Sequence, residues 1–523
     1  MIWFLVKSTV ISVINQMNKL FLKVAALLGI SLLFGAIHSV DKPHNTAVLL
    51  GRPNPSTPKR PNVLFICIDD LRPDLGSYGN AEIHSPNLDA LASQGHTFTR
   101  QYVAVPTCGA SRYALLTGKR PMTPAEINNN AMITELSRKP RTEVPETFVD
   151  HLRRSGYYTV GIGKISHMPD GYVYGYEEPK SNQLELPYSW DEMLFDHGKW
   201  GTGHNAFFGY ADGSNRQSRN KQVKPYESAD VDDEGYPDGL SARLAVSKLQ
   251  ELSKKDQPFF LSVGFFKPHL PFTAPKKYWD LYDESKISLT PSPDIPENVN
   301  AASLHQSSEF NSYQAGDERA SLENPVSDAY ARKLRHAYYA SVSYTDAQVG
   351  RVLSELKRLG LDKNTIVVVW SDHGWQLGDY RVWGKHTIFE RAVRSVLIVK
   401  TPDGKKGRKQ DEIVSSIDIY PSLLELCGQQ PIAEVDGKSF VKLLKQKKVR
   451  DWDNVAYSYY NQGISVRTDR YRLTKYFRQA QPVIELFDHR NDPNENKNIA
   501  ESNPKIVQSL VPVLEKGNTG LYD

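Results

Sequence analysis

The chain has 523 residues, of which 40% are hydrophobic and 24% are charged, and its formal net charge is +4. This length exceeds what a single compact core usually supports, so we expect one large domain and a smaller one. The sequence contains no heptad pattern, internal repeat or block of Lys and Arg, which excludes a coiled coil, a solenoid and a typical nucleic-acid-binding protein. The small positive charge permits an anionic partner without requiring one.

The N-terminal segment has the layout of a secretory signal peptide. From Met17 the sequence MNKLFLKVAALLGISLLFGAIHS places two lysines ahead of an apolar stretch, and small residues follow it. We predict a signal peptide over 1–39, with translation beginning at Met1 or Met17, and a linker over 40–60. The protein would then be periplasmic or secreted. A single membrane anchor is the alternative, although the apolar stretch is short for a membrane span.

Strands and helices alternate in the prediction from residue 62 onward. The run NVLFICIDD is apolar until its two aspartates, which is typical of a parallel strand buried on both faces. In chain order the predicted elements are a strand over 62–70, a helix over 86–94, a strand over 96–103, a helix over 144–156, a strand over 158–164, a strand over 258–269, a helix over 328–359 and a strand over 364–374.

This alternation predicts an α/β fold with a mixed, largely parallel sheet flanked by helices, in a catalytic domain over 61–436. Residues 437–523 contain short strand-like runs followed by a helix from residue 503, which predicts a smaller C-terminal subdomain with an antiparallel sheet. Two long polar stretches, 168–238 and 283–327, show no clear period. Loops of this length in a compact domain are usually functional or mobile.

Polar residues follow several of the predicted strands. Because ligands bind outside the carboxyl ends of the strands in such sheets, we expect these side chains to share one rim. They are Asp69, Asp70, Lys164, His269, Asp372 and His373.

Two adjacent aspartates end the first strand. In a strand Asp69 and Asp70 would face opposite ways, but a turn at the strand end would let both carboxylates reach one cation. Asp372 would add a third carboxylate, and oxygen-rich ligand sets suit calcium or magnesium. Taken alone, two aspartates more often mark the start of a loop. The run SDHG at the end of a second buried strand favours the metal site.

Cys108 has an unusual setting among the three cysteines. Cys67 lies in an apolar run and Cys427 follows a Leu-rich helix, so both are predicted to be buried packing residues. Cys108 lies near a predicted helix N-terminus, where the helix dipole favours anions and would lower the pKa of a thiol. Two interpretations stay open: a cysteine nucleophile, for which no Cys-His signature is evident, and a buried structural cysteine.

Six stretches between Asn62 and the end of the chain resemble the type I (formylglycine-dependent) sulfatase family. The run CGASRYALLTGKRP is similar to the family signature Cys-x-(Pro/Ala)-Ser-Arg followed by Leu-Thr-Gly. The other five are NVLFICIDDLRPDLGSYG, VGIGKISH, FFKPHLPF, VVVWSDHGWQLGDYRVWGKH and ELFDHRNDPNENKN. Within the family the motif forms are similar to those of iduronate-2-sulfatase, which has alanine where this chain has Gly109.

The resemblance implies an alkaline-phosphatase-like fold and a sulfuric ester hydrolase. In that family the cysteine is oxidised to formylglycine after translation, so Cys108 would be the precursor of the nucleophile. A formylglycine-generating enzyme or an anaerobic sulfatase-maturating enzyme would then be a partner. A calcium ion would be held by Asp69, Asp70, Asp372 and His373, together with the residue derived from Cys108.

The resemblance also implies roles for five basic residues. Arg112 would hold the hydrated aldehyde, and Lys164 and Lys385 would contact the sulfate. His269 would protonate the leaving alcohol, and His167 would act as the base that expels sulfate. The simpler alternatives are solvated strand-end side chains for Lys164 and His167, and a packed turn histidine for His269.

Two other functions compete with a sulfatase. One is a phosphodiesterase or phosphonate hydrolase of the same superfamily, which can carry a similar cysteine. The other is a non-catalytic, secreted glycan-binding protein in which Cys108 stays unmodified. The substrate expected of a sulfatase is a sulfated oligo- or polysaccharide, either a 2-O-sulfated uronate in a heparin-like chain or an algal polysaccharide such as ulvan. His386 is suggestive of a substrate contact.

Overall fold

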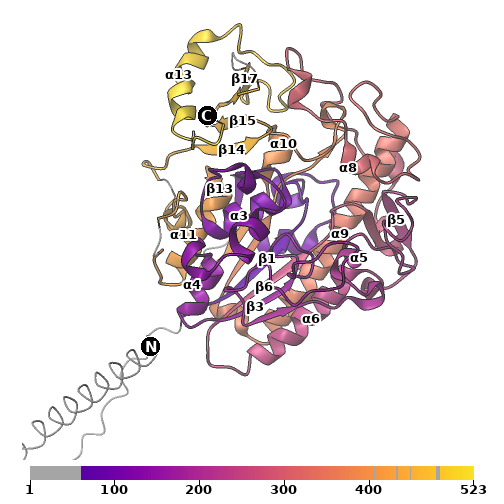
Figure 1. The fold of residues 1–523 in the computed structure, drawn as a ribbon, viewed down its shortest axis with the longest axis vertical. Helices are drawn as coiled ribbons and strands as arrows, with labels where there is room; N and C mark the ends of the chain where they lie inside the picture. Colours follow the sequence, from indigo (N-terminus) through magenta and orange to yellow (C-terminus); the bar gives the residue numbers. More distant parts are fainter. Residues whose placement is uncertain (1–59, 405–406, 432–433, 448, 479–482, 523) are drawn as a thin grey trace, which may run out of the picture. The chain divides into compact units, whose positions relative to one another are not determined.

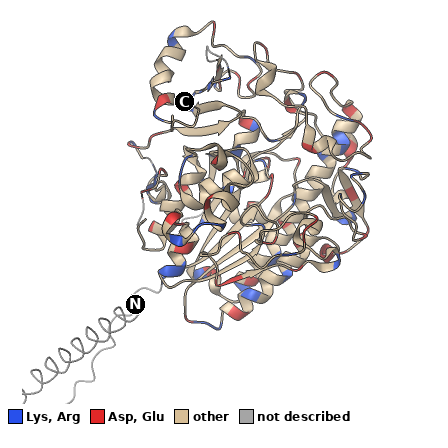
Figure 2. Ribbon diagram, viewed as in Figure 1, with Lys and Arg blue, Asp and Glu red and all other residues tan. Residues whose placement is uncertain are grey.

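The computed structural model describes residues 60–522 except 405–406, 432–433, 448 and 479–482. The signal peptide predicted over 1–39 and the linker over 40–60 lie outside the described residues, apart from residue 60. Within the described part, no helix is both long enough and apolar enough to cross a membrane. Acidic and basic residues are interspersed along the outer helices and loops (Figure 2), in keeping with the small net charge.

A mixed sheet of nine strands forms the centre of the fold (Figure 1). The strands β8, β1, β6, β3 and β4 lie side by side in that order and are parallel, whereas β12 pairs antiparallel with β8 and β2. Their bounds are β1 Asn62–Ile68, β2 His96–Tyr102, β3 Tyr158–Gly163, β4 Glu192–Leu194, β6 Phe259–Phe265, β8 Thr365–Ser371, β11 Arg394–Ser395, β12 Leu397–Lys400 and β13 Arg408–Ser415.

Strand β1 lies between β6 and β8 and is buried along its whole length. Its side chains alternate between two hydrophobic clusters, since Leu64, Ile66 and Ile68 belong to one and Val63, Phe65 and Cys67 to the other. The prediction of a parallel strand covered on both faces is therefore confirmed.

Helices cover both faces of this sheet, as the α/β prediction requires. The first cluster packs β1 against α2 (Pro86–Ala92), α6 (Pro237–Leu252) and the long α9 (Asp328–Arg358). The second packs it against α3 (Cys108–Thr117), α4 (Phe148–Arg154) and α11 (Ile419–Leu426). Figure 1 shows α3, α4 and α11 on one side of β1, β6 and β3, and α6 and α9 on the other.

The C-terminal region carries its own antiparallel sheet in the order β14-β15-β16-β17. These strands span Ala456–Tyr460, Gly463–Arg467, Tyr471–Tyr476 and Val483–Asp488, and α13 spans Pro504–Glu515. Leu514 of α13 packs in a separate hydrophobic cluster with Ile464, Leu473 and Leu486. The antiparallel sheet and the terminal helix are as predicted, and the boundary between 436 and 437 stays a prediction.

The two stretches expected to be long loops contain short elements that the sequence did not reveal. In 168–238 these are β4, α5 (Gly203–Phe207) and β5 (Tyr226–Ala229), and in 283–327 the main one is α8 (Ser308–Asn311). Strand β4 extends the main sheet beside β3, and β5 pairs with β7 (Phe272–Pro275). Elements of three to five residues are too short to show a period in the sequence.

Candidate active site

The rim predicted from the strand ends exists in the structure. Asp69 and Asp70 follow β1, Lys164 follows β3, and Asp372 and His373 follow β8. Because these strands are parallel neighbours or flank a common neighbour, their carboxyl ends meet at the same edge of the sheet. His269 lies four residues beyond the end of β6, which pairs with both β1 and β3.

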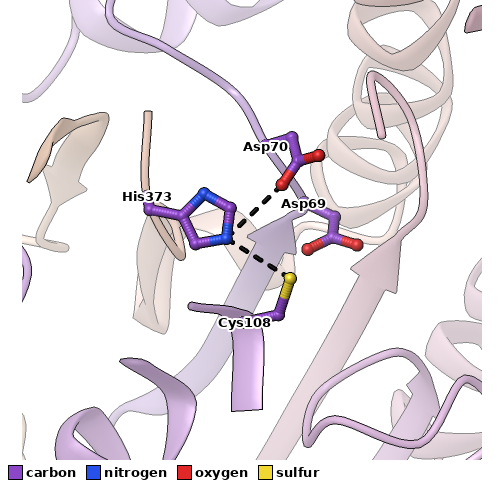
Figure 3. Close-up of side chains that lie close together, drawn as sticks. All are labelled: Asp69, Asp70, Cys108 and His373. Atoms are coloured by element: carbon purple, nitrogen blue, oxygen red, sulfur yellow. Dashed lines mark hydrogen bonds and ion pairs between the residues drawn. The ribbon is translucent and has the colours of Figure 1, made fainter. Parts of the chain in front are cut away.

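Four of these side chains form a compact buried cluster (Figure 3). Ligand atoms of Asp69, Asp70, Cys108 and His373 all lie within 4.8 Å of one another. Nε2 of His373 is 3.3 Å from Sγ of Cys108 and 3.4 Å from Oδ1 of Asp70. Cys108 is the first residue of α3, so the helix N-terminus points its side chain at the end of β1.

The tautomer of His373 bears on what this cluster can bind. Its Nδ1 lies 2.9 Å from the carbonyl oxygen of Gly374. A carbonyl only accepts, so Nδ1 carries a proton, and in the neutral side chain Nε2 is left with a lone pair that faces Asp70. A neutral imidazole and an ionised Asp70 would both be acceptors here, and a cation between them would relieve their repulsion. A histidine that donates its other N–H to a backbone carbonyl is the usual form of a metal ligand, and the oxygen-rich set suits a hard divalent ion.

The turn at Asp70 brings the two adjacent carboxylates together, as expected. Asp70 has the left-handed backbone angle φ 60°, which costs a non-glycine residue about 1–2 kcal/mol. Buried hydrogen bonds hold the turn: the hydroxyl of Tyr338 donates to the Asp70 carbonyl at 2.7 Å and accepts the N–H of Arg72 at 3.0 Å. Strain of this kind persists only where the surroundings stabilise it.

The two carboxylates differ in how their charge is balanced. Burial alone would raise the pKa of Asp69, but Lys164, with Nζ 2.5 Å from Oδ2, holds that pKa well below its usual range. Burial raises the pKa of Asp70 well above its usual range, even though Nζ of Lys385 lies 3.0 Å from Oδ1. Lys385 therefore does not fully offset the cost of burying the Asp70 carboxylate, and a further positive charge beside it would stabilise its ionised form.

Asp372 lies beside the cluster of four rather than within it. Its Oδ1 accepts the backbone N–H of Asp70 at 3.0 Å and its Oδ2 accepts Nε of Arg112 at 3.0 Å. The buried Arg112 also donates to the carbonyls of Lys164 and Ile165. Arg112 thus connects the ends of β3 and β8. Within the described residues its hydrogen bonds go to oxygen atoms near Cys108, and none goes to Sγ of Cys108.

His269 and Lys385 face a residue that the sequence did not single out. Nδ1 of His269 donates to the carbonyl of Leu270 at 2.6 Å, and Nε2 lies 3.0 Å from Oε1 of Glu309 and 3.8 Å from Oδ2 of Asp70. Nζ of Lys385 lies 3.3 Å from Oε2 of Glu309. Glu309 belongs to the four-residue α8, and nothing in its sequence context signals a site.

His167 lies in the turn after β3 and has no hydrogen bond to Nδ1 within the described residues. Burial, and then the charge of Lys164, hold its pKa well below the usual value, with smaller effects from Arg112 and Lys385. It is therefore a neutral side chain within electrostatic range of the other basic residues. Lys164 also lies 4.1 Å from the ring centre of Phe207.

One expectation about Cys108 is wrong. The pKa is raised rather than lowered: burial, and then the charge of Asp69, raise the pKa of the thiol to about 12 and outweigh any lowering by the helix N-terminus. The structure also explains Gly109, because a Cβ at that position would lie 2.2 Å from the carbonyl oxygen of Asn129. Cys67 and Cys427 are buried free thiols, as predicted.

Comparisons with known proteins agree with this geometry. The family model described as Sulfatase matches residues 61–429, and a model of the C-terminal part of N-sulphoglucosamine sulphohydrolase matches 378–518. A sulfatase of Formosa agariphila is 31% identical over 480 residues, covering 88% of this chain and 87% of that protein. Iduronate 2-sulfatase of Homo sapiens is 30% identical over 427 residues, covering 75% and 74%.

The fold is also found in solved structures. The phosphonate monoester hydrolase of Agrobacterium radiobacter superposes with a TM-score of 0.69 at 22% identity, covering 88% of this chain and 95% of that one. At this identity the likeness shows the fold alone, and it agrees with the predicted alkaline-phosphatase-like class. Since the family model covers more than half of the chain, this protein belongs to the sulfatase family of sulfuric ester hydrolases and is similar to iduronate 2-sulfatase within it.

Proposed function

We propose that the protein is an exported enzyme that removes sulfate esters from a sulfated oligo- or polysaccharide, using a formylglycine made from Cys108 and a calcium ion. The observation that carries this proposal is the cluster in which Cys108 meets Asp69, Asp70 and His373, with Lys164 and Lys385 beside it. A buried site of this composition provides for a nucleophile, a divalent ion and an anionic substrate.

The nucleophile comes from position 108. As a thiol with a raised pKa, Cys108 is a poor nucleophile at neutral pH. Conversion to formylglycine by a maturating enzyme of the host would place an oxygen of the hydrated aldehyde where Sγ now lies. The N-terminus of α3 favours negative charge on that oxygen. Arg112, buried behind it, orients Asp372 through the hydrogen bond at 3.0 Å.

The residues that would hold calcium are Asp69, Asp70, Asp372 and His373. When bound there, the ion would lower the pKa of the nucleophile and offset charge that develops on the sulfate oxygens. The fit rests on the paired carboxylates and on the Nε2 lone pair of His373 that faces one of them. Asp372 would reach the ion only by sharing an oxygen that already accepts a hydrogen bond.

The cations around the cluster suit a sulfate ester. Lys164 and Lys385 are buried ammonium groups that now pair with Asp69 and Asp70. With a divalent ion on the carboxylates, both ammonium groups would be free to act on the sulfate as point charges. Burial lowers the pKa of His269 to about 4, so this residue would have to gain a proton on Nε2, 3.0 Å from Glu309, before donating it to the leaving alcohol. His167, held neutral, would take a proton when sulfate is expelled.

The substrate is proposed to be a glycan. Its support is the similarity to iduronate 2-sulfatase, together with the predicted signal peptide of a periplasmic or secreted protein. A heparin-like chain with a 2-O-sulfated uronate and an ulvan-like chain both combine uronates with sulfate esters. The stretches 168–238 and 283–327 supply Phe207 and Glu309 next to the site, so these stretches would shape the pocket for the sugar.

Sulfate release from defined heparin and ulvan oligosaccharides tests this function. The mature protein should release sulfate from at least one of them. Paired 4-nitrophenyl sulfate and phosphate separate a sulfatase from the phosphodiesterase alternative, because a sulfate monoester carries one negative charge and a phosphate monoester carries up to two. Release of phosphate but not sulfate would support that alternative, and glycan binding without release would support a non-catalytic protein.

A further inference from the structure

Next to the active site lies an arginine that pairs with no carboxylate of the described residues. Arg216 belongs to the stretch 168–238, and its guanidinium lies 3.8 Å from the ring centre of Phe208. Nη1 donates to Oγ of Ser312 at 3.2 Å, and the buried Nε has no partner within the described residues. Arg216 is half-buried, and its side-chain hydrogen bond within the described residues goes to a hydroxyl, so its charge is available to an anionic ligand.

Aromatic contacts connect Arg216 with the proposed acid, His269. The ring centre of Phe208 lies 6.1 Å from that of His269, and the preceding Phe207 lies 4.4 Å from it. Tyr176 also packs against Phe208, with 5.5 Å between the two ring centres. Tyr176 is 44% exposed. Arg216 and the exposed Tyr176 therefore share one aromatic support beside the leaving-group side of the site.

The pKa of Tyr176 reflects charges on both sides of this aromatic contact. Partial burial raises the pKa of Tyr176, which is 44% exposed, to about 12. The charge of Arg216 opposes this rise, whereas the charges of Glu309 and Cys108 add to it. The Tyr176 hydroxyl thus lies within electrostatic range of both Arg216 and Cys108. The ring contacts from His269 to Phe208, and from Phe208 to both Tyr176 and Arg216, connect this pair with the leaving-group side of the site.

Among the described lysines around the cluster, Lys164 and Lys385 have carboxylate partners, and the buried Lys267 donates to the backbone carbonyls of His269 and Pro271. Lys164 pairs with Asp69, and Lys385 pairs with Asp70 and Glu309. Arg216 differs from these lysines because its charge is not offset by a carboxylate of the described residues and because its guanidinium is planar. Its planar guanidinium lies over the ring of Phe208, and a guanidinium can make two parallel hydrogen bonds to a carboxylate or a sulfate.

We propose that Tyr176, Phe208 and Arg216 form a subsite for a second anionic group of the substrate, distinct from the ester that is hydrolysed. The group is a carboxylate or a second sulfate, carried by the same sugar or by the next one. The exposed ring of Tyr176 supports the apolar face of that sugar, and Arg216 binds the oxyanion. This inference rests on the proposed glycan sulfatase function and narrows its substrate to glycans with at least two anionic groups close together.

Arg216→Gln tests the subsite, with Arg219→Gln as the matched control. Arg219 lies in the same stretch, is 55% exposed and pairs with Asp212, so its loss removes the same charge without touching the subsite. Arg216→Lys keeps the charge and the stem but loses the planar fork. Sulfate release is measured on heparin and ulvan tetrasaccharides in three forms: intact, carboxyl-reduced, and desulfated to a single ester.

On the intact forms, Arg216→Gln should lower kcat/KM by about tenfold to a hundredfold, mainly through KM, since a hydrogen-bonded charge is lost. Arg216→Lys should lose less, and Arg219→Gln should match the wild type. If the second anionic group is a carboxylate, the loss disappears on the carboxyl-reduced form. If the group is a sulfate, the loss disappears on the form with a single ester.

An equal loss on all three forms, or no loss on any of them, overturns the subsite and leaves the sulfatase function standing. A wild type that releases sulfate from neither glycan contradicts the proposed function, and the subsite with it.

Discussion

Sγ of Cys108 lies 3.3 Å from Nε2 of His373, although the two residues are 265 positions apart in the chain. Strand β8 brings His373 to the sheet edge, and the N-terminus of α3 brings Cys108 to the same point. The same Nε2 lies 3.4 Å from Asp70. A group placed at position 108 and an ion held by Asp70 and His373 would therefore be direct neighbours, as ion-assisted attack requires.

Asp70→Asn should weaken calcium binding at this site by tenfold or more (order of magnitude from the loss of a ligand charge) and should inactivate the enzyme. The substitution keeps the shape of the side chain but removes the formal charge that Lys385 and the proposed ion share. Elemental analysis and activity after chelation and calcium readdition measure the effect. The control is Asp469→Asn, a 64% exposed aspartate paired with Arg100. A wild-type protein with no bound divalent ion, indifferent to chelators, would contradict the site.

His269→Ala should slow sulfate release from a sugar by about 10²–10⁴-fold, the usual contribution of a positioned acid. The loss should be much smaller with 4-nitrophenyl sulfate, because nitrophenolate needs little protonation to leave. Comparing kcat/KM on the two substrates, for the variant and the wild type, gives the result. Equal losses on both substrates would mean that His269 does not act on the leaving oxygen.

His167→Ala should stop turnover after the first step, because the residue is proposed to take the proton when sulfate is expelled. Sulfate should then stay attached to residue 108, and intact mass after mixing with substrate should rise by about 80 Da. His269→Ala should show no such adduct. The opposite pattern would reverse the two roles, and an adduct on neither variant would argue against covalent catalysis.

Glu495→Gln should destabilise the fold by about 3–5 kcal/mol, because it leaves a buried arginine unpaired. Glu495 and Arg472 are both buried, with Nε of the arginine 2.5 Å from Oε1, and Oε2 accepts the N–H of Glu390 at 2.8 Å. Burial would raise the pKa of Glu495, but Arg472 and then His489 hold it well below the ordinary 4.5. Its stabilising effect is thus present above about pH 4.5 and is lost as the pH falls toward the lowered pKa.

Urea unfolding at pH 7 and at pH 4 measures this prediction. The difference between wild type and Glu495→Gln should be large at pH 7 and smaller at pH 4. Glu297→Gln is the control, since Glu297 is 67% exposed in its pair with Lys497. A difference of less than about 1 kcal/mol at pH 7, the size expected of a surface pair, would contradict the buried role.

The sequence predicts the parts of the site that follow long, strongly patterned elements. Asp69, Lys164 and Asp372 end strands whose apolar runs are unmistakable, and parallel pairing alone brings them to one edge. Glu309 and Arg216 could not be predicted, because they lie in stretches whose helices and strands have three to five residues. The raised thiol pKa of Cys108 could not be predicted either, because it comes from burial and from Asp69, which is far away in the sequence and close in the fold.

The central claim is that Cys108 is the precursor of the nucleophile, and one measurement on matched proteins tests it most directly. The wild type and Cys108→Ala are produced with a sulfatase-maturating enzyme, and the mass of the peptide containing residue 108 is compared with sulfate release from the same preparation. The account predicts that the wild-type peptide is lighter than its thiol form by about 18 Da, as an aldehyde is, and that Cys108→Ala releases no sulfate. An active wild type with an unmodified thiol, or a Cys108→Ala protein that keeps more than about one per cent of the activity, would contradict it.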